Sequence, residues 1–192
     1  NCIMPIPLGI LAVAGAGGGA AASSFDLLET TLISSNTASV SFSNLNNYSS
    51  YKHLQLRATV RDNTSQTGNL NLDLQINGDT GTNYAYHFLR GNGSAVVSAS
   101  SSSNSIIRFF DTIPGSTSTA SAFGCLVLDV LDFSSSNKNT TVRALSGANV
   151  SAENTVLLSS GVWLNTASVT SLTLTAPNAF LSGSRFSLYG IK

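Results

Sequence analysis

Charge is what this sequence has least of. Lys, Arg, Asp and Glu together make up 9% of its 192 residues, whereas an ordinary soluble domain has about 25%. Nine basic residues balance nine acidic ones, so the formal net charge is zero. Without an excess of Lys and Arg, the chain offers no basic stripe for a phosphate backbone, and we expect no nucleic-acid partner. A neutral surface also lacks the self-repulsion that keeps monomers apart, and it therefore suits a permanent assembly.

Cysteine and histidine are also scarce, with two of each. The chain therefore lacks the clustered ligands of a tetrahedral zinc site, and His53 and His87 are isolated bases for any nucleophilic triad. No spacing among the acidic residues nominates the two facing carboxylates of a glycosidase. We expect neither an enzyme nor a cofactor. Cys125 lies in an apolar run and is interpreted as a small buried side chain, and Cys2 as an incidental thiol.

Residues 1–24 contain no charged side chain at all. Proline and glycine interrupt this segment, and no positive residues precede its apolar part, so neither a membrane helix nor a secretory signal fits well. We predict an assembly arm that is buried against neighbouring subunits, and we do not expect a membrane partner. A membrane anchor and a processing remnant or disordered tail are the alternatives. The apolar side chains of the arm are Ile3, Ile6, Leu8, Ile10, Leu11 and Val13.

From residue 25 onward, apolar and polar residues alternate with period two, as in 54–60 and 70–76. This pattern is typical of antiparallel strands with one buried face, and no window shows a helical period. Polar turn clusters separate the runs, and the serine run 100–103 is interpreted as a surface loop. The sequence predicts an all-β chain: one antiparallel β-sandwich domain over 25–192, with a jelly roll as its form. Further predicted strands are 26–33, 39–43, 84–90, 105–111, 122–133, 140–145, 155–164, 169–175 and 185–191.

The loop 77–83 is the one candidate metal site. Asn77, Asp79 and Asn83 place oxygen atoms at alternating positions, which is what calcium requires. The loop has only one carboxylate, however, and it lacks the bidentate Glu of an EF-hand. The alternative is an Asn-Gly hairpin turn followed by an Asx turn.

Aromatic side chains are the candidates for ligand binding. Tyr48, Tyr51, Tyr84, Tyr86 and Trp163 could stack on the sugar rings of a host surface glycan. The alternative is that Trp163 anchors the core while the tyrosines lie at strand edges or subunit interfaces.

Two acidic residues interrupt the apolar run 123–133. Asp129 and Asp132 could be metal ligands or an acid–base pair. The alternative is that Asp129 faces solvent or pairs with Arg108 or Arg143, while Asp132 starts the next turn.

Five segments, in the order in which they occur, resemble a group of small structural proteins of tailed bacteriophages, particularly those of marine and cyanobacterial hosts. The segments are MPIPLG at 4–9, YKHLQLR at 51–57, NGDTGTNY at 77–84, GVWLNT at 161–166 and LYGIK at 188–192. The resemblance implies a virion component, jelly-roll-like and a symmetric oligomer, with a homotrimer expected.

The leading interpretation is a capsid decoration or cement protein that stabilises the shell and binds the major capsid protein through its arm. A head- or tail-fibre module that recognises host surface glycan is the second interpretation. A polysaccharide depolymerase is a third and more distant one.

Overall fold

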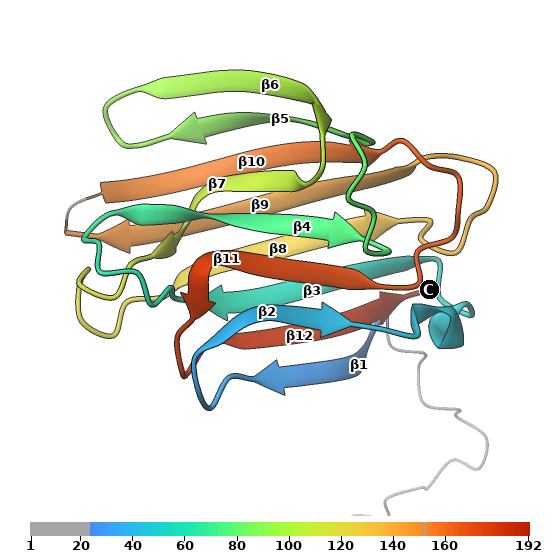
Figure 1. Ribbon diagram of the computed structural model, residues 1–192, viewed down its shortest axis with the longest axis horizontal. Helices are drawn as coiled ribbons and strands as arrows, with labels where there is room; N and C mark the ends of the chain where they lie inside the picture. The colour runs from blue at the N-terminus through green and yellow to red at the C-terminus, as the bar shows by residue number, and fades with distance from the viewer. Residues whose placement is uncertain (1–23, 152) are drawn as a thin grey trace, which may run out of the picture.

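The computed structural model describes residues 24–151 and 153–192. They form two antiparallel sheets packed face to face, with the four-stranded sheet in front of the eight-stranded sheet in Figure 1. The prediction of an all-β antiparallel sandwich is confirmed. In spatial order, the larger sheet contains β1 (Phe25–Leu32), β12 (Arg185–Ile191), β3 (His53–Val60), β8 (Gly124–Leu131), β9 (Thr140–Val150), β10 (Glu153–Trp163), β5 (Tyr84–Gly91) and β6 (Val96–Asn104). The smaller sheet contains β2 (Thr37–Phe42), β11 (Leu172–Phe180), β4 (Asn69–Ile76) and β7 (Ile107–Pro114).

Alternation of buried and exposed residues places the core between the sheets. Along β9 and β10 every second side chain is buried, and the two strands pair over their whole length. The largest buried side chains include Trp163, Tyr84, Phe42 and Phe109. Gly161 is part of the same packing, because a Cβ there would lie 2.8 Å from the side chain of Ile107. The apolar residues of period two in the sequence are therefore the residues that hold the sheets together.

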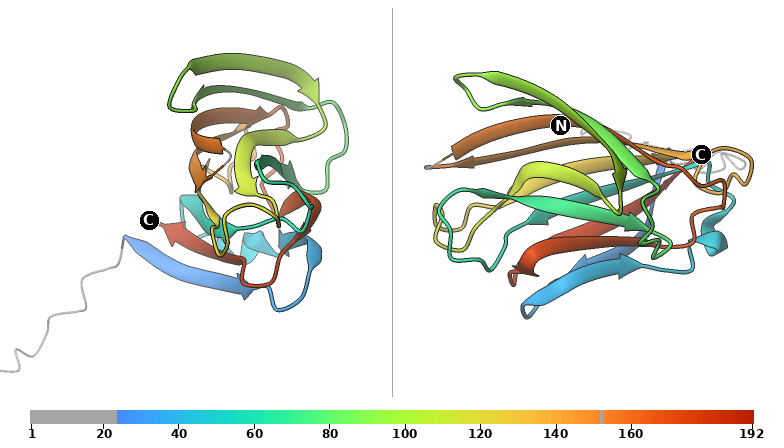
Figure 2. Two further views of the ribbon diagram at one scale, coloured as in Figure 1. Left: turned by 90° about the vertical axis from the view of Figure 1, so that its left-hand side faces the viewer. Right: turned by 45° about the horizontal axis from the view of Figure 1, so that its top comes forward.

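One strand contradicts the sequence analysis. The predicted loop 100–103 lies inside β6, an edge strand of the larger sheet that pairs with β5. Nearly every residue of β6 is exposed, so the strand has no alternation of apolar and polar residues to reveal it. The β5–β6 hairpin forms the top of the molecule in Figure 1, beyond the smaller sheet, and both views in Figure 2 show how it projects.

The chain passes repeatedly from one sheet to the other. β1, β3, β8 and β12 belong to the larger sheet, and β2, β4, β7 and β11 to the smaller. Two hairpins, β5–β6 and β9–β10, are inserted between them and extend the larger sheet on one side. A single turn of 3-10 helix, Leu45–Tyr48, lies between β2 and β3. The jelly roll stays a prediction.

The predicted domain, 25–192, begins where β1 begins. The predicted arm and its six apolar side chains lie outside the described residues, except for Ser24 at the end of the arm.

Candidate functional site: the outer face of the larger sheet

Four aliphatic side chains lie in register across adjacent strands on the outer face, the side of the larger sheet that is turned away from the smaller sheet. Backbone pairing places Val127 of β8 opposite Leu145 of β9, Leu145 opposite Leu158 of β10, and Leu158 opposite Leu89 of β5. Their exposed fractions are 38, 55, 51 and 49%, respectively. We call these four residues the aliphatic row. An exposed sheet face normally carries polar side chains, so this row departs from the usual pattern.

A polar row runs beside the aliphatic row and is displaced from it by two residues on each strand, toward the same end of the sheet. It contains Asp129, Arg143, Ser160, His87 and Ser100, each opposite the next. An Arg143 Nη atom donates to the Asp129 carboxylate over 2.7 Å, so the two charges in this row neutralise each other. The other members offer hydroxyl groups and one imidazole.

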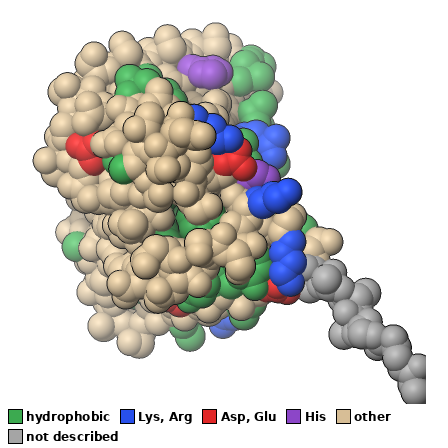
Figure 3. All heavy atoms as spheres, turned by 90° about the vertical axis from the view of Figure 1, so that its right-hand side faces the viewer, with side chains coloured by type: hydrophobic (Ala, Val, Ile, Leu, Met, Phe, Trp, Pro, Cys, Tyr) green, Lys and Arg blue, Asp and Glu red, His purple; other side chains and the backbone are tan. Residues whose placement is uncertain are grey.

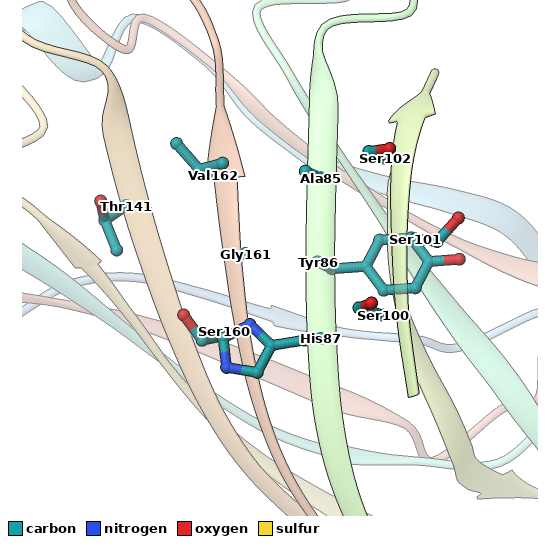
Figure 4. Close-up of a pocket in the computed structure, with 10 residues that line it drawn as sticks. All are labelled: Ala85, Tyr86, His87, Ser100, Ser101, Ser102, Thr141, Ser160, Gly161 and Val162. Carbon is teal, nitrogen blue, oxygen red and sulfur yellow. The ribbon is translucent and has the colours of Figure 1, made fainter. Parts of the chain in front are cut away.

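A hollow of about 360 Å³ lies over the aliphatic row itself, lined by Val127, Leu145 and Leu158 among others, and two further hollows lie toward β5 and β6. The larger, about 680 Å³, is lined mostly by hydroxyl groups around His87, including those of Thr141, Ser160 and Ser100. Figure 4 shows the His87 ring beside Ser160, its partner across the two strands. The smaller hollow, about 290 Å³, is more apolar and lies between Leu89 and Leu158. Shallow hollows of this kind suit a broad contact better than a deeply enclosed small molecule.

Charged side chains are few in the whole sequence, but one of them, Arg57 of β3, lies opposite Val127 at the end of the aliphatic row, with its guanidinium over the rings of Phe25 and Tyr189. In the view of Figure 3, charged and histidine side chains are few and lie mainly along one side of the molecule. The next line of outward positions beyond the aliphatic row contains the exposed Val156 and Val96 together with Cys125, and it continues through Thr59 to Arg185. Cys125 is exposed, so the prediction of a buried thiol is wrong. Cys125 lies two residues from Val127 in β8, so both side chains are on the outer face of the sheet.

The calcium candidates are close in sequence but are engaged in different contacts. The Asn77 side-chain oxygen accepts hydrogen bonds from the backbone of Thr170 and Ser171. The Asp79 carboxylate accepts from the indole N–H of Trp163 over 2.7 Å and from the Asn83 side chain over 2.9 Å. The Asn77 side-chain oxygen and the Asp79 carboxylate, which would bind the metal, therefore already accept hydrogen bonds.

Hydrogen bonds also fix the electrostatics of this loop. The donors from Trp163, Asn83 and the Gly81 backbone favour the ionised carboxylate and lower the pKa of Asp79. The Asx turn expected after Asn77-Gly78 is present, because the Gly81 N–H donates to Asp79. The turn does not close a hairpin, since β4 and β5 belong to different sheets. The calcium role stays a prediction.

The four tyrosines do not share a face. Tyr84 is fully buried, and its hydroxyl donates to the Ile76 carbonyl over 3.0 Å. Burial raises its pKa, and its ring is a core element rather than a surface for sugar. Tyr86 is partly buried beside Phe110, with ring centroids 6.0 Å apart. The expectation that Trp163 anchors the core is confirmed.

Tyr48 and Tyr51 lie in another region, around the 3-10 turn before β3. Both are partly buried against the core, and the Tyr51 hydroxyl donates to Asp26 over 2.9 Å. That hydrogen bond raises the pKa of Tyr51. An aromatic stacking surface made from the four predicted tyrosines is therefore not assembled.

The carboxylates within 123–133 have structural partners. Asp129 pairs with Arg143, one of the two expected partners, and Asp132 lies in the turn after β8, as expected. The Asp132 backbone N–H donates to Nδ1 of His53 over 2.9 Å. Among residues 24–151 and 153–192, no group of three His, Cys, Asp or Glu side chains could hold a metal ion.

Sequence reasoning missed the aliphatic row. The signal was present in β10, where Val156, Leu157 and Leu158 follow one another and break the alternation. Only the cross-strand register shows that Leu158 lies beside Leu145 and Leu89, because these residues are distant in sequence.

No family model, curated protein or solved structure matches the chain. No helix in the described part of the chain is long and apolar enough to cross a membrane.

Proposed function

We propose that the chain is a structural protein of a bacteriophage virion, and specifically a capsid decoration or cement protein. The observation that carries the proposal is the aliphatic row, an apolar strip on the outer face of the larger sheet. Contiguous exposed apolar patches larger than a few hundred Å² mark interaction surfaces. In an assembled particle, neighbouring proteins can keep such a surface covered.

The strand connectivity supports a jelly-roll body. Without the two inserted hairpins, each sheet keeps four strands, in the orders β1-β12-β3-β8 and β2-β11-β4-β7. The pairs are nested, because β1 joins β12, β2 joins β11, β3 joins β8, and β4 joins β7. A long hairpin folded across two sheets gives this nesting, and a jelly roll of eight strands has that form. Jelly rolls are common in viral capsids, although a fold alone does not determine function.

The mechanism that we propose is binding without catalysis. Each copy buries apolar surface against other copies and against the major capsid protein, and the arm of residues 1–24 adds a second attachment. Linked contacts of modest affinity strengthen one another through effective concentration. The protein then stabilises the shell by holding neighbouring shell subunits together.

One observation favours the second candidate, a module that binds host glycan. The hydroxyl-lined hollow around His87 could bind an uncharged polyhydroxyl ligand. Of the predicted tyrosines, only Tyr86 lines this hollow, and it is partly buried beside Phe110, while Tyr84 is in the core. We therefore rank glycan recognition below decoration.

The experiment that tests the proposal compares particles with and without this chain. Purified particles are analysed by quantitative mass spectrometry for copy number, and then heated while genome release is followed. Decoration predicts many copies per particle, and earlier genome release when the gene is deleted. If the chain is absent from the particles, the virion proposal is wrong. If deletion abolishes host adsorption but leaves thermal release unchanged, the glycan candidate replaces decoration.

A further inference from the structure

We infer that a second copy of this chain docks on the aliphatic row, outer face against outer face, around a two-fold axis. This inference rests on the proposed function, because it identifies the partner of the surface that carries that proposal. Its test below is independent of virus particles, so the two can fail separately.

The size of the outer face is sufficient for a stable pair. Eight strands about 4.8 Å apart, each about eight residues long at roughly 3.3 Å per residue, give a face on the order of 1,000 Å². A standard interface takes about 800 Å² from each partner. The aliphatic row lies across β8, β9, β10 and β5, so apolar contacts would extend over half of the strands. Burial of these aliphatic side chains removes apolar surface from water, which favours association.

The chemistry of the face is self-complementary, which a two-fold contact requires. Aliphatic side chains pack against the same side chains of a copy. A serine or threonine hydroxyl both donates and accepts a hydrogen bond, so Ser160 and Thr141 can pair with identical groups. The Asp129–Arg143 ion pair has no net charge and presents both signs to its copy. The outer face also carries Arg57 beside Val127 and Arg185 on the line of Cys125, so it presents charges of both signs rather than one sign alone.

Other occupants fit these residues less well. An anionic membrane surface attracts a patch rich in Lys and Arg with aromatic neighbours. The polar row has one Arg, which Asp129 neutralises, and Arg57, which lies over the rings of Phe25 and Tyr189, borders only the Val127 end of the aliphatic row. A glycan would need an exposed Phe, Tyr or Trp ring, and neither row contains one; Tyr86 lines the hollow beside His87 but is partly buried beside Phe110. The outer face matches its own copy better than it matches a lipid or a sugar.

The test measures the mass of the full chain in solution by sedimentation velocity over a wide range of concentrations. The row variant carries Leu145→Asp together with Leu158→Asp. Both side chains are half exposed in the monomer, so the fold should survive, and circular dichroism checks this. We expect the wild-type chain to sediment as a dimer or an even multiple of it. We expect the row variant to be monomeric, with a dissociation constant raised by at least about 100-fold.

A matched control adds the same two charges on the opposite side of the molecule. Ser41→Asp together with Thr173→Asp changes two residues that face each other on β2 and β11, on the outward side of the smaller sheet. This control should assemble like the wild-type chain. An alkylation assay gives a second reading without altering the row: in a Cys2→Ser chain, the exposed Cys125 should react more slowly as the concentration rises.

Several results would overturn the pairing. They are a wild-type chain that stays monomeric throughout, a row variant that is folded yet assembles like the wild type, and assembly only in multiples of three chains. Cys125 reactivity that does not depend on concentration would also count against it. A monomeric chain that is nevertheless abundant in particles would refute the pairing and leave the virion proposal intact. A chain that pairs but is absent from particles would support the pairing and refute the virion proposal.

Discussion

Arg61 offers a sharp test of what holds one end of the sandwich together. It follows β3 and is 4% exposed, and its guanidinium donates four hydrogen bonds to backbone carbonyls of the loop before β8. The acceptors are the carbonyl oxygens of Ser116, Ser118, Thr119 and Ala122, at 2.9–3.1 Å. The fork of the guanidinium reaches all four at once, which no other side chain can do.

The expected loss can be worked from these contacts. A hydrogen bond to a charged group contributes about 1.5–3 kcal/mol, and the four bonds therefore contribute about 6–12 kcal/mol gross. Burying the guanidinium costs several kcal/mol, and Arg61→Met recovers that cost. We expect a net loss of about 3 kcal/mol for Arg61→Met. Arg61→Lys keeps the charge but has only three donors, so about 1–2 kcal/mol should be lost.

The assay is equilibrium unfolding in urea, with the midpoint and the slope fitted for each variant. The matched control is Arg57→Met, which removes an exposed guanidinium from the outer face and should change stability by less than about 1 kcal/mol. The wild type should be the most stable, Arg61→Lys should be intermediate, and Arg61→Met should be the least stable. The reasoning fails if Arg61→Met is as stable as the wild type, or if the Lys variant is the less stable of the two.

Three further predictions concern other parts of the chain. The pKa of Asp79 is lowered on folding from its ordinary value of 3.8, so its contribution to stability is complete above that pH and is lost as pH falls through the folded-state value. Asp79→Asn should flatten the acid limb of stability against pH followed by Trp163 fluorescence, and an unchanged limb would refute this. Gly124→Ala should cost about 3 kcal/mol or more in urea unfolding, because its Cβ would lie 1.9 Å from the Thr112 carbonyl oxygen. Gly91→Ala, whose nearest atom would be 3.5 Å away, is the control and should change stability by less than about 1 kcal/mol. Deleting residues 1–24 should leave a soluble, folded body that no longer sediments with particles, and undiminished binding would refute the anchoring role.

The strands were predictable because the alternation of apolar and polar residues in the local sequence indicates which side chains are buried. The predicted strand at 185–191 coincides with β12, and the other predicted strands overlap observed ones, because one face of each is apolar and the other polar. β6 escaped prediction because neither of its faces is buried along most of its length. The connection between β4 and β5 escaped because an Asn-Gly turn has the same local conformation within a sheet and between sheets.

The candidate site was less predictable, for a physical reason. Exposure depends on which face a strand presents, and that choice is made by partners far away in sequence. Tyr84 was a plausible surface aromatic until the structure placed it in the core. Cys125 was a plausible core residue until the register of β8 turned it outward. Leu158 was identified as part of an exposed apolar row only when the strand register placed it beside Leu145 and Leu89.

A cryo-electron-microscopy map of the intact particle tests the central claim most directly. We expect density for this sandwich on the capsid shell, in many copies, with the outer face covered by another protein chain. Density confined to the tail or to a fibre tip, with the outer face open to solvent, would contradict decoration and would make the hollow around His87 the place to look for sugar. A complete map in which this chain has no density would contradict the claim that it is a structural protein of the virion.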